Sequence, residues 1–209
     1  MMIVYGQASS PYCQKVTMML ECLALPYGFR TPAPGGGDTV SAELLALNPN
    51  GTVPVLLDQD NGVSVFESAA ILLYLAEKTG KLMPTEPRPR AEVYQWLLFE
   101  AATLGAVAGE LYHYLCVAPE DVPYAQARNK RRFLHCAAIL EKRLDGRDFL
   151  CGTLSIVDMA IYPWVNLLED FTSTPLSAYP HLSGWLTRMR QHASQTPPRI
   201  SEQVAETSC

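Results

Sequence analysis

The sequence predicts a chain in two parts, a mixed α/β domain followed by an all-α domain. Residues 1–81 alternate short β-rich runs with helical patterns in the order β-α-β-α-β-β-α. After them, three prolines between Pro84 and Pro89 predict a stiff linker over residues 82–89. Every long pattern over residues 90–209 is helical. We therefore expect the boundary between the two domains at this linker.

The first domain is expected to open with a strand and a helix. The run 2–5 is apolar and β-rich and stops at Gly6, and from Pro11 apolar residues recur at helical spacing until Pro26. Asn61-Gly62 lies between two apolar runs and predicts a hairpin. The other expected elements are a strand at 27–29, an irregular loop around Gly35–Gly37, a helix at 41–47, strands at 53–57 and 63–66, and a helix at 67–78.

The second domain is expected to consist of helices. Ser155 and Asp158 have the spacing of a capping box, which predicts that a helix starts there. The expected helical segments are 90–115, 124–144, 156–171 and 179–192.

Charged residues make up only 18% of the chain, against about 25% in ordinary globular proteins. Two stretches account for the shortage: 96–119 carries only Glu100 and Glu110, and 149–168 carries only Asp158. A surface helix of a monomer keeps a polar face for water. We therefore expect 149–168 in the core of the helical domain. We expect 96–119 to face both an apolar substrate cleft and the partner subunit of a homodimer.

The composition excludes several classes of protein. With 48% apolar residues the chain can bury a core, so it is not wholly disordered. The longest apolar run, 69–76, is far shorter than the roughly 20 residues of a membrane span, and a net charge of −5 does not suit nucleic acid. The four histidines and six cysteines lack metal-ligand spacing, so we expect no metal. The first ten residues lack the basic segment of a signal peptide, which favours the cytoplasm.

Ser10 lies where the first strand passes into the first helix. Pro11 suits the first helical position, so Ser10 is expected at the N-cap, beside free amides and the positive end of the helix dipole. Two interpretations stay open. Ser10 either caps the helix, or its hydroxyl donates a hydrogen bond to a bound thiolate, which the helix end also favours by lowering the pKa of the thiol.

A second feature is the proline at the start of the third expected strand. Pro54 predicts a bend or a sheet edge there, and a cis peptide bond is compatible with it. A cis bond would turn the amide and carbonyl of Val53 outward, where an added peptide strand can pair with them. The alternative is an ordinary proline between a loop and a strand.

The third feature is Glu67-Ser68, where the fourth expected strand passes into a helix. Free backbone amides and a serine hydroxyl at a helix start form a site for a carboxylate or phosphate. Glu67 can meanwhile accept from an ammonium group, so the pair suits an α-amino acid group. The alternative is a helix whose first turn carries a favourable acid.

The three features suit one ligand: a small peptide with a thiol, a backbone that pairs and a free amino-acid end, which is glutathione. The whole chain resembles the cytosolic glutathione S-transferase family, which has a thioredoxin-like first domain and an all-α second domain. The segments 123–128, around Gly105 and 155–164 are most similar to the bacterial nu-like group. This resemblance implies glutathione as co-substrate, a homodimer, and activity as a transferase, disulfide-bond reductase or peroxidase.

The resemblance also implies roles for individual residues. Ser10 stands where the family has the serine or threonine beside the glutathione sulfur. For Arg128, a solvated helix face is the alternative to glutathione binding. Helix placement puts the second substrate near Leu104, Tyr112 and His113. The expected glutathione-binding residues are Tyr12, Thr52, Val53, Pro54, Glu67, Ser68 and Arg128.

The residues around Ser10 also differ from the nu-like pattern, which has an asparagine at Tyr12 and often a basic residue at Thr52. Ser10-Pro11-Tyr12-Cys13 is similar to the CPYC motif of glutaredoxins with the first cysteine replaced by serine. Glutaredoxins attack with that first cysteine. Cys13 is therefore expected to be a bystander or a site of glutathionylation, in preference to a nucleophile.

Two classes of function follow. The first is an enzyme that stabilises the glutathione thiolate for attack on an electrophilic carbon, a disulfide or a peroxide. The second is a non-catalytic protein of the same fold with a binding, regulatory or stress role. Such relatives often lose the hydroxyl beside the sulfur or the Glu-Ser pair. Since this chain has both, the sequence favours the enzyme.

Overall fold

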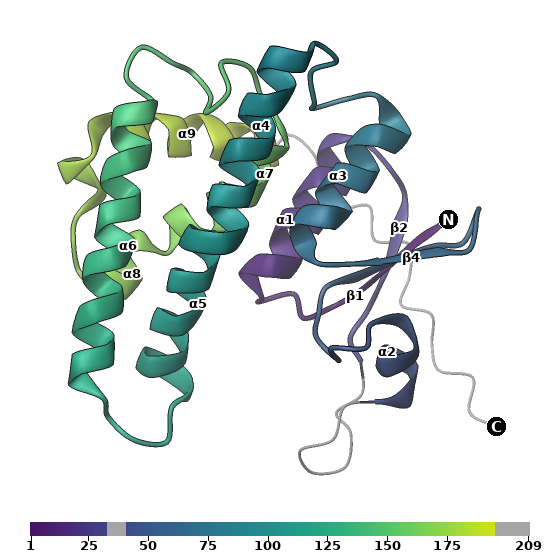
Figure 1. Ribbon diagram of the computed structural model, residues 1–209, viewed down its shortest axis with the longest axis horizontal. Helices are drawn as coiled ribbons and strands as arrows, with labels where there is room; N and C mark the ends of the chain where they lie inside the picture. Colours follow the sequence, from purple (N-terminus) through teal and green to yellow (C-terminus); the bar gives the residue numbers. More distant parts are fainter. Residues whose placement is uncertain (33–40, 195–209) are drawn as a thin grey trace. The chain divides into compact units, whose positions relative to one another are not determined.

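The computed structural model describes residues 1–32 and 41–194. The chain forms two compact units (Figure 1). Unit 1 is Met1–Lys81 together with His192 and the described residues after it, and unit 2 is Leu82–Gln191. The loop expected around Gly35–Gly37 and the tail from Gln195 lie outside the described residues.

Unit 1 has the expected order β-α-β-α-β-β-α, and the thioredoxin-like arrangement is confirmed. Its sheet has the order β2-β1-β3-β4, with β1 parallel to β2 and antiparallel to β3, and β3 antiparallel to β4. The elements are β1 (Met2–Tyr5), α1 (Pro11–Cys22), β2 (Tyr27–Arg30), α2 (Ala42–Leu47), β3 (Val55–Asp58), β4 (Val63–Phe66) and α3 (Ser68–Thr79).

Helices cover both faces of this sheet (Figure 1). On one face Ile3 and Tyr5 of β1 form a buried cluster with Leu44 of α2 and Val55 of β3. Side chains alternate along a strand, so Val4 points to the other face, where α1 packs against α3. Helices and sheet thereby fix the loops at the ends of the strands.

Asp58, at the end of β3, is a fully buried acid that ties α3 to the sheet. Its Oδ2 accepts from the Tyr74 hydroxyl at 2.5 Å and from the Lys78 ammonium, and its Oδ1 accepts from the Asp60 amide at 3.2 Å. Burial raises the pKa of the Asp58 carboxyl. The three donors and the charge of Lys78 lower it by more, so the net pKa lies below its ordinary value.

We expect Asp58→Asn to destabilise unit 1 by about 1–3 kcal/mol at pH 7, because buried donors lose a charged acceptor. A carboxyl whose pKa is lowered on folding stabilises above its unfolded pKa, and that stability is lost as the pH falls through the folded value. The difference between wild type and Asp58→Asn should therefore be full at pH 7 and shrink below about pH 4. Urea unfolding followed by circular dichroism measures it, with the exposed Asp60→Asn as control; a constant difference down to pH 3 would contradict the assignment.

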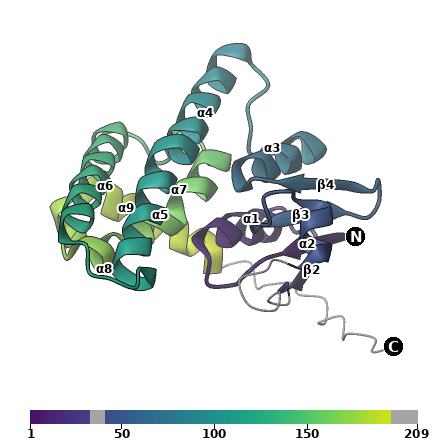
Figure 2. The same ribbon diagram turned by 60° about the horizontal axis from the view of Figure 1, so that its bottom comes forward.

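Unit 2 is helical throughout its regular elements (Figure 2). In chain order they are α4 (Pro87–Phe99), the π-helical turn η1 (Glu100–Leu104), α5 (Gly105–Tyr112), the π-helical turn η2 (His113–Val117), α6 (Pro123–Arg143), α7 (Ile156–Asn166), α8 (Leu168–Thr172), the 3₁₀ turn η3 (Leu176–Ala178) and α9 (Pro180–Ser194). Over the described ranges, no helix is both long enough and apolar enough to span a membrane.

The helices of unit 2 differ from the sequence prediction most in three places. α4 begins at Pro87, earlier than the expected 90, because the first turn of a helix tolerates residues without an N–H. The helix expected over 90–115 includes the two π-helical turns, and the one expected over 156–171 is divided at Leu167. No periodic pattern in the sequence marks any of these details.

The expected core helix is confirmed. Along α7, nine of the eleven residues are buried, including Trp164. The capping box at its start is also present, with the Ser155 hydroxyl accepting from the Val157 amide at 3.3 Å and Asp158 Oδ2 accepting from the Ser155 amide at 3.0 Å. The helical part of the charge-poor stretch 149–168 is therefore largely interior, while Gly152, Thr153 and Asn166 of that stretch are exposed.

Candidate functional site

The three segments singled out in the first domain lie at the same edge of the sheet. The last residue of β1, Tyr5, pairs with Val55, the first residue of β3, and Val55 pairs with Phe66, the last residue of β4. The end of β1, the start of β3 and the end of β4 therefore lie in one row across the sheet. This register gathers the segments of Ser10, Val53-Pro54 and Glu67-Ser68 at one edge of unit 1.

Ser10 occupies the N-cap position of α1, and its side chain makes no capping hydrogen bond. A turn fixes its backbone: the Ser10 amide donates to the Gln7 carbonyl at 3.0 Å, and the Ser10 carbonyl accepts from the amides of Cys13 and Gln14 at 3.0 and 2.9 Å. The backbone of Ser10 is thus held while its hydroxyl is not used for the cap. Of the two interpretations of Ser10, the geometry does not support simple capping.

Cys13 lies beneath the loop that carries Ser10. Its side chain is 1% exposed, and its sulfur accepts from the Gln7 amide at 3.4 Å. The sulfur also explains Gly6, where an added Cβ would lie only 2.6 Å from Cys13 Sγ. Burial raises the pKa of the Cys13 thiol, and hydrogen bonds from the Gln7 amide and the Ser10 side chain offset this only in part. A buried thiol with a raised pKa is a poor nucleophile.

We expect Cys13 to resist alkylation in the native protein, because iodoacetamide reacts with an exposed thiolate. Cys22 and Cys116 are exposed and provide the internal comparison. Mass spectrometry of the native protein should find the label on these two cysteines before it appears on Cys13. Labelling of Cys13 as rapid as that of Cys22 or Cys116 would contradict its role as a buried bystander.

At the start of β3, the peptide bond between Val53 and Pro54 is cis, as the sequence allowed. Val53 is half-buried and Pro54 is buried. Among the backbone hydrogen bonds of residues 1–32 and 41–194, none involves Val53. Its amide and carbonyl are therefore available to pair with a peptide ligand.

Asn48 supports this bend, and sequence reasoning missed it. The side chain is buried, and its Nδ2 donates to the Thr52 carbonyl at 2.8 Å and to Thr52 Oγ1 at 3.1 Å. Its Oδ1 accepts from the Asn50 amide at 3.0 Å. Thr52 is exposed but held by these bonds. An asparagine side chain often accepts a hydrogen bond from the backbone amide two residues further on, and this preference could have pointed to the role of Asn48.

Glu67 is the N-cap residue of α3 and has φ 67°, a left-handed conformation that is rare for a residue other than glycine. Such backbone conformations cluster at ligand sites. Its exposed side chain makes no capping hydrogen bond, so the first amides of α3 lack a side-chain cap. Ser68 follows as the first helical residue and is 7% exposed. An acid, a hydroxyl and uncapped amides therefore lie together.

Tyr12 is half-buried in the first turn of α1, and the Lys15 ammonium lies 4.7 Å from the centre of its ring. The remaining predicted site residues belong to unit 2. Arg128 is exposed on α6, and Tyr112 and His113 are exposed where α5 meets η2. Leu104 differs from its expected placement: it is 1% exposed, because it faces the helices packed against η1. In residues 1–32 and 41–194, no group of three or more His, Cys, Asp or Glu side chains could hold a metal.

Comparison with known proteins identifies the family. Residues 4–86 match the family model described as "Glutathione S-transferase, N-terminal domain", and residues 105–193 match "Glutathione S-transferase, C-terminal domain". The chain is 35% identical to the disulfide-bond oxidoreductase YfcG of Escherichia coli over 95% of each chain. It is 38% identical to the disulfide-bond oxidoreductase YghU of the same species over 91% of this chain and 72% of that one. The chain belongs to the glutathione S-transferase family.

Solved structures show the same fold. A glutathione transferase from Burkholderia graminis, with two glutathione molecules bound per subunit, superimposes with a TM-score of 0.82 at 28% identity, over 92% of this chain and 87% of that one. A glutathione transferase from Pseudomonas putida, with one glutathione disulfide bound per subunit, gives a TM-score of 0.82 at 28% identity over 94% and 91%. These structural relatives bind glutathione or glutathione disulfide.

Proposed function

We propose that this protein is an enzyme that binds glutathione at the sheet edge of unit 1 and uses its thiolate. The observation that carries the proposal is the register of β1, β3 and β4, which brings Ser10, the free backbone of Val53 and the Glu67-Ser68 pair to one edge. Each supplies what one part of glutathione needs. Family membership and the glutathione-bound relatives support the same ligand.

In the proposed complex the γ-glutamyl end lies at the start of α3. Its carboxylate accepts from the uncapped amides and the Ser68 hydroxyl, and its ammonium donates to Glu67. The backbone of glutathione pairs with Val53 beside Pro54, and Thr52 and Tyr12 flank it. The sulfur lies at Ser10. Arg128 of unit 2, implied by the family resemblance, is a further contact to glutathione.

Ser10 makes the sulfur reactive. A hydrogen bond from its hydroxyl and the positive end of α1 favour the thiolate, and the thiolate is the nucleophile. Attack on an electrophilic carbon expels its leaving group and forms a thioether. Attack on a disulfide expels one thiolate and leaves a mixed disulfide with glutathione, which a second glutathione cleaves to give glutathione disulfide and the other thiol.

Of these reactions, we propose disulfide reduction as the main activity. The relatives YfcG and YghU are disulfide-bond oxidoreductases and match nearly the whole chain. The buried Cys13 also fits, since the reaction then needs no protein thiol: two glutathione molecules supply both electrons. Peroxide reduction follows the same scheme with a peroxide oxygen as the electrophile, and conjugation to carbon is the second candidate.

We propose that the second substrate contacts Tyr112 and His113, with Leu104 packed beneath the surface. Exposed apolar side chains continue along the same charge-poor stretch, at Leu98 (63% exposed), Leu115 and Val117. They support a homodimer as well as an apolar substrate site.

We therefore expect a solution mass of twice the chain's 23.1 kDa by light scattering. A single 23.1 kDa species at micromolar concentration would contradict the dimer. The cytoplasm, where glutathione is reduced, is the proposed location.

Two measurements test the proposed function. Calorimetry should show saturable binding of glutathione, weakened by Ser68→Ala but not by Ser64→Ala on β4, which lies away from the start of α3. Turnover should then be followed with an aryl halide and a small disulfide side by side. Faster turnover of the disulfide supports the reductase, and faster turnover of the halide supports the transferase. Binding without turnover of either would favour the non-catalytic alternative, and no binding would overturn the proposal.

A further inference from the structure

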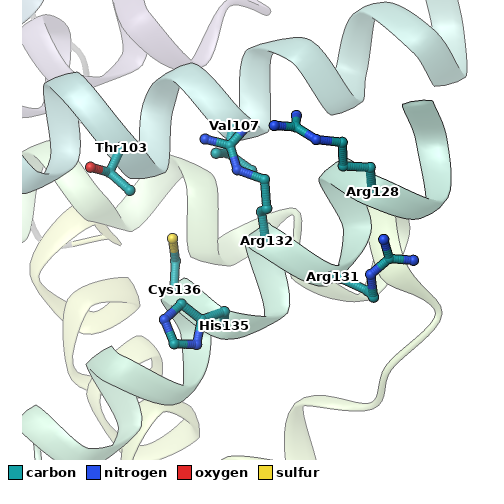
Figure 3. A pocket seen from close by; sticks show the side chains of 7 residues that line it. All are labelled: Thr103, Val107, Arg128, Arg131, Arg132, His135 and Cys136. Carbon is teal, nitrogen blue, oxygen red and sulfur yellow. The ribbon is translucent and has the colours of Figure 1, made fainter. Parts of the chain in front are cut away.

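Unit 2 contains a pocket of which the proposed function uses only Arg128. It has a volume of about 280 Å³ and is formed by η1, α5 and α6 alone (Figure 3). Most of its lining comes from one face of α6, where the residues recur at helical spacing. The lining residues are Thr103, Val107, Arg128, Arg131, Arg132, His135 and Cys136.

The pocket concentrates positive charge in a chain whose net charge is −5. Arg128, Arg131 and Arg132 line it within two turns of α6. Two other arginines of unit 2 pair with acids: Arg143 with Glu92, and Arg188 with Asp148 at 3.9 Å. Within the ranges that the structure describes, no carboxylate pairs with the three pocket arginines, and Arg132 has only a long bond to Asn129 Oδ1, at 3.4 Å.

Neighbouring groups leave this charge uncompensated. Burial raises the pKa of the Cys136 thiol, so this side chain is neutral at pH 7 although Arg132 acts against the shift. Val107 is buried and apolar, and Thr103 contributes only a hydroxyl. Figure 3 shows the guanidinium groups of Arg128 and Arg132 extending toward α5 beside Val107, while that of Arg131 lies apart. All three arginines are exposed, so water screens part of their mutual repulsion, and an anion between them would add favourable attraction to each.

We propose that this pocket binds a small multivalent anion, a phosphate or a polycarboxylate. A guanidinium group offers donors in a planar fork that matches both kinds of oxyanion. More than one arginine faces the pocket, so an anion with several charged oxygens can contact them together, and it offers more charge to them than acetate or chloride does. A ligand in this pocket touches only unit 2, so the inference does not rest on the glutathione site of unit 1.

Calorimetric titration with citrate and with inorganic phosphate, without glutathione and at constant ionic strength, tests the proposal. We expect saturable binding of at least one of the two, and none of acetate. Arg132→Gln should weaken that binding about tenfold or more, because it removes charge-assisted hydrogen bonds. The matched control is Lys130→Gln, which removes one charge from the same helix outside the pocket and should leave binding within twofold.

Further variants separate this site from the proposed glutathione site. Ser68→Ala should leave citrate or phosphate binding unchanged, since that residue lies in unit 1. If Arg132→Gln and Lys130→Gln weakened anion binding equally, the anion would be attracted to the overall charge of α6, and the proposal of a site in the pocket would be wrong. Weaker anion binding in Ser68→Ala, or no saturable binding in the wild type, would also overturn the proposal. Glutathione binding measured on the same samples reports on the proposed function independently.

Discussion

Replacing Ser10 by alanine should lower turnover by about 10²-fold to 10³-fold, the effect of removing one donor to a developing or bound anion at an active site. The hydroxyl is not used for the cap of α1, so its loss should cost only the hydrogen bond to the Cys13 side chain, about 0.5–1.5 kcal/mol. The effect should fall on kcat more than on KM for glutathione, because the γ-glutamyl end and the backbone of the tripeptide are held elsewhere. Both the aryl halide and the disulfide should be affected, since both need the thiolate.

Ser9→Ala is the matched control for Ser10→Ala. Ser9 is the same residue type in the same loop, and it is exposed. It should keep the wild-type rate, and Ser10→Thr should recover most of the activity because it restores a hydroxyl. The pKa of bound glutathione, followed by thiolate absorbance in a pH titration, should be higher in Ser10→Ala than in the wild type. Unchanged turnover and an unchanged thiol pKa would show that Ser10 is not the group that stabilises the thiolate.

The sequence was sufficient for the elements and for the residues of the sheet edge in unit 1. Ser10, Val53 and Glu67 stand at junctions between strand and helix, and turn residues mark such junctions in the pattern itself. The order of the strands in the sheet is known from the structure, because periodicity contains no information about which strands pair. Their common edge became visible only through the register Tyr5, Val55 and Phe66.

Other features depend on packing and had no sequence signal. The left-handed backbone of Glu67 is imposed by its surroundings, since glutamate has no preference for it. The burial of Leu104 depends on which helices lie against η1. For Arg128 the sequence predicts glutathione binding, with a solvated helix face as the alternative. It does not predict the arginine pocket, because a pocket exists only once α5 and α6 are placed side by side.

Asp158 should be the most sensitive single position for the stability of unit 2. Its carboxylate is fully buried and accepts four hydrogen bonds, from the Leu150 amide and Trp185 Nε1 on Oδ1 (3.0 and 2.9 Å), and from the Ser155 amide and hydroxyl on Oδ2 (both 3.0 Å). Asp158→Ala leaves these donors buried without an acceptor. The free energy of unfolding should fall by about 3–5 kcal/mol.

Tryptophan fluorescence during urea unfolding measures this loss in unit 2 alone, because Trp96, Trp164 and Trp185, the three tryptophans of the chain, all lie there. Asp170→Ala removes the same group from an exposed position on α8 and should change stability by less than about 0.5 kcal/mol. Asp158→Asn keeps the shape but turns an amide nitrogen toward two donors, so its loss should be smaller than that of Asp158→Ala and larger than that of Asp170→Ala. If Asp158→Ala were no more harmful than Asp170→Ala, the buried carboxylate would not be what joins α7, the Leu150 loop and α9.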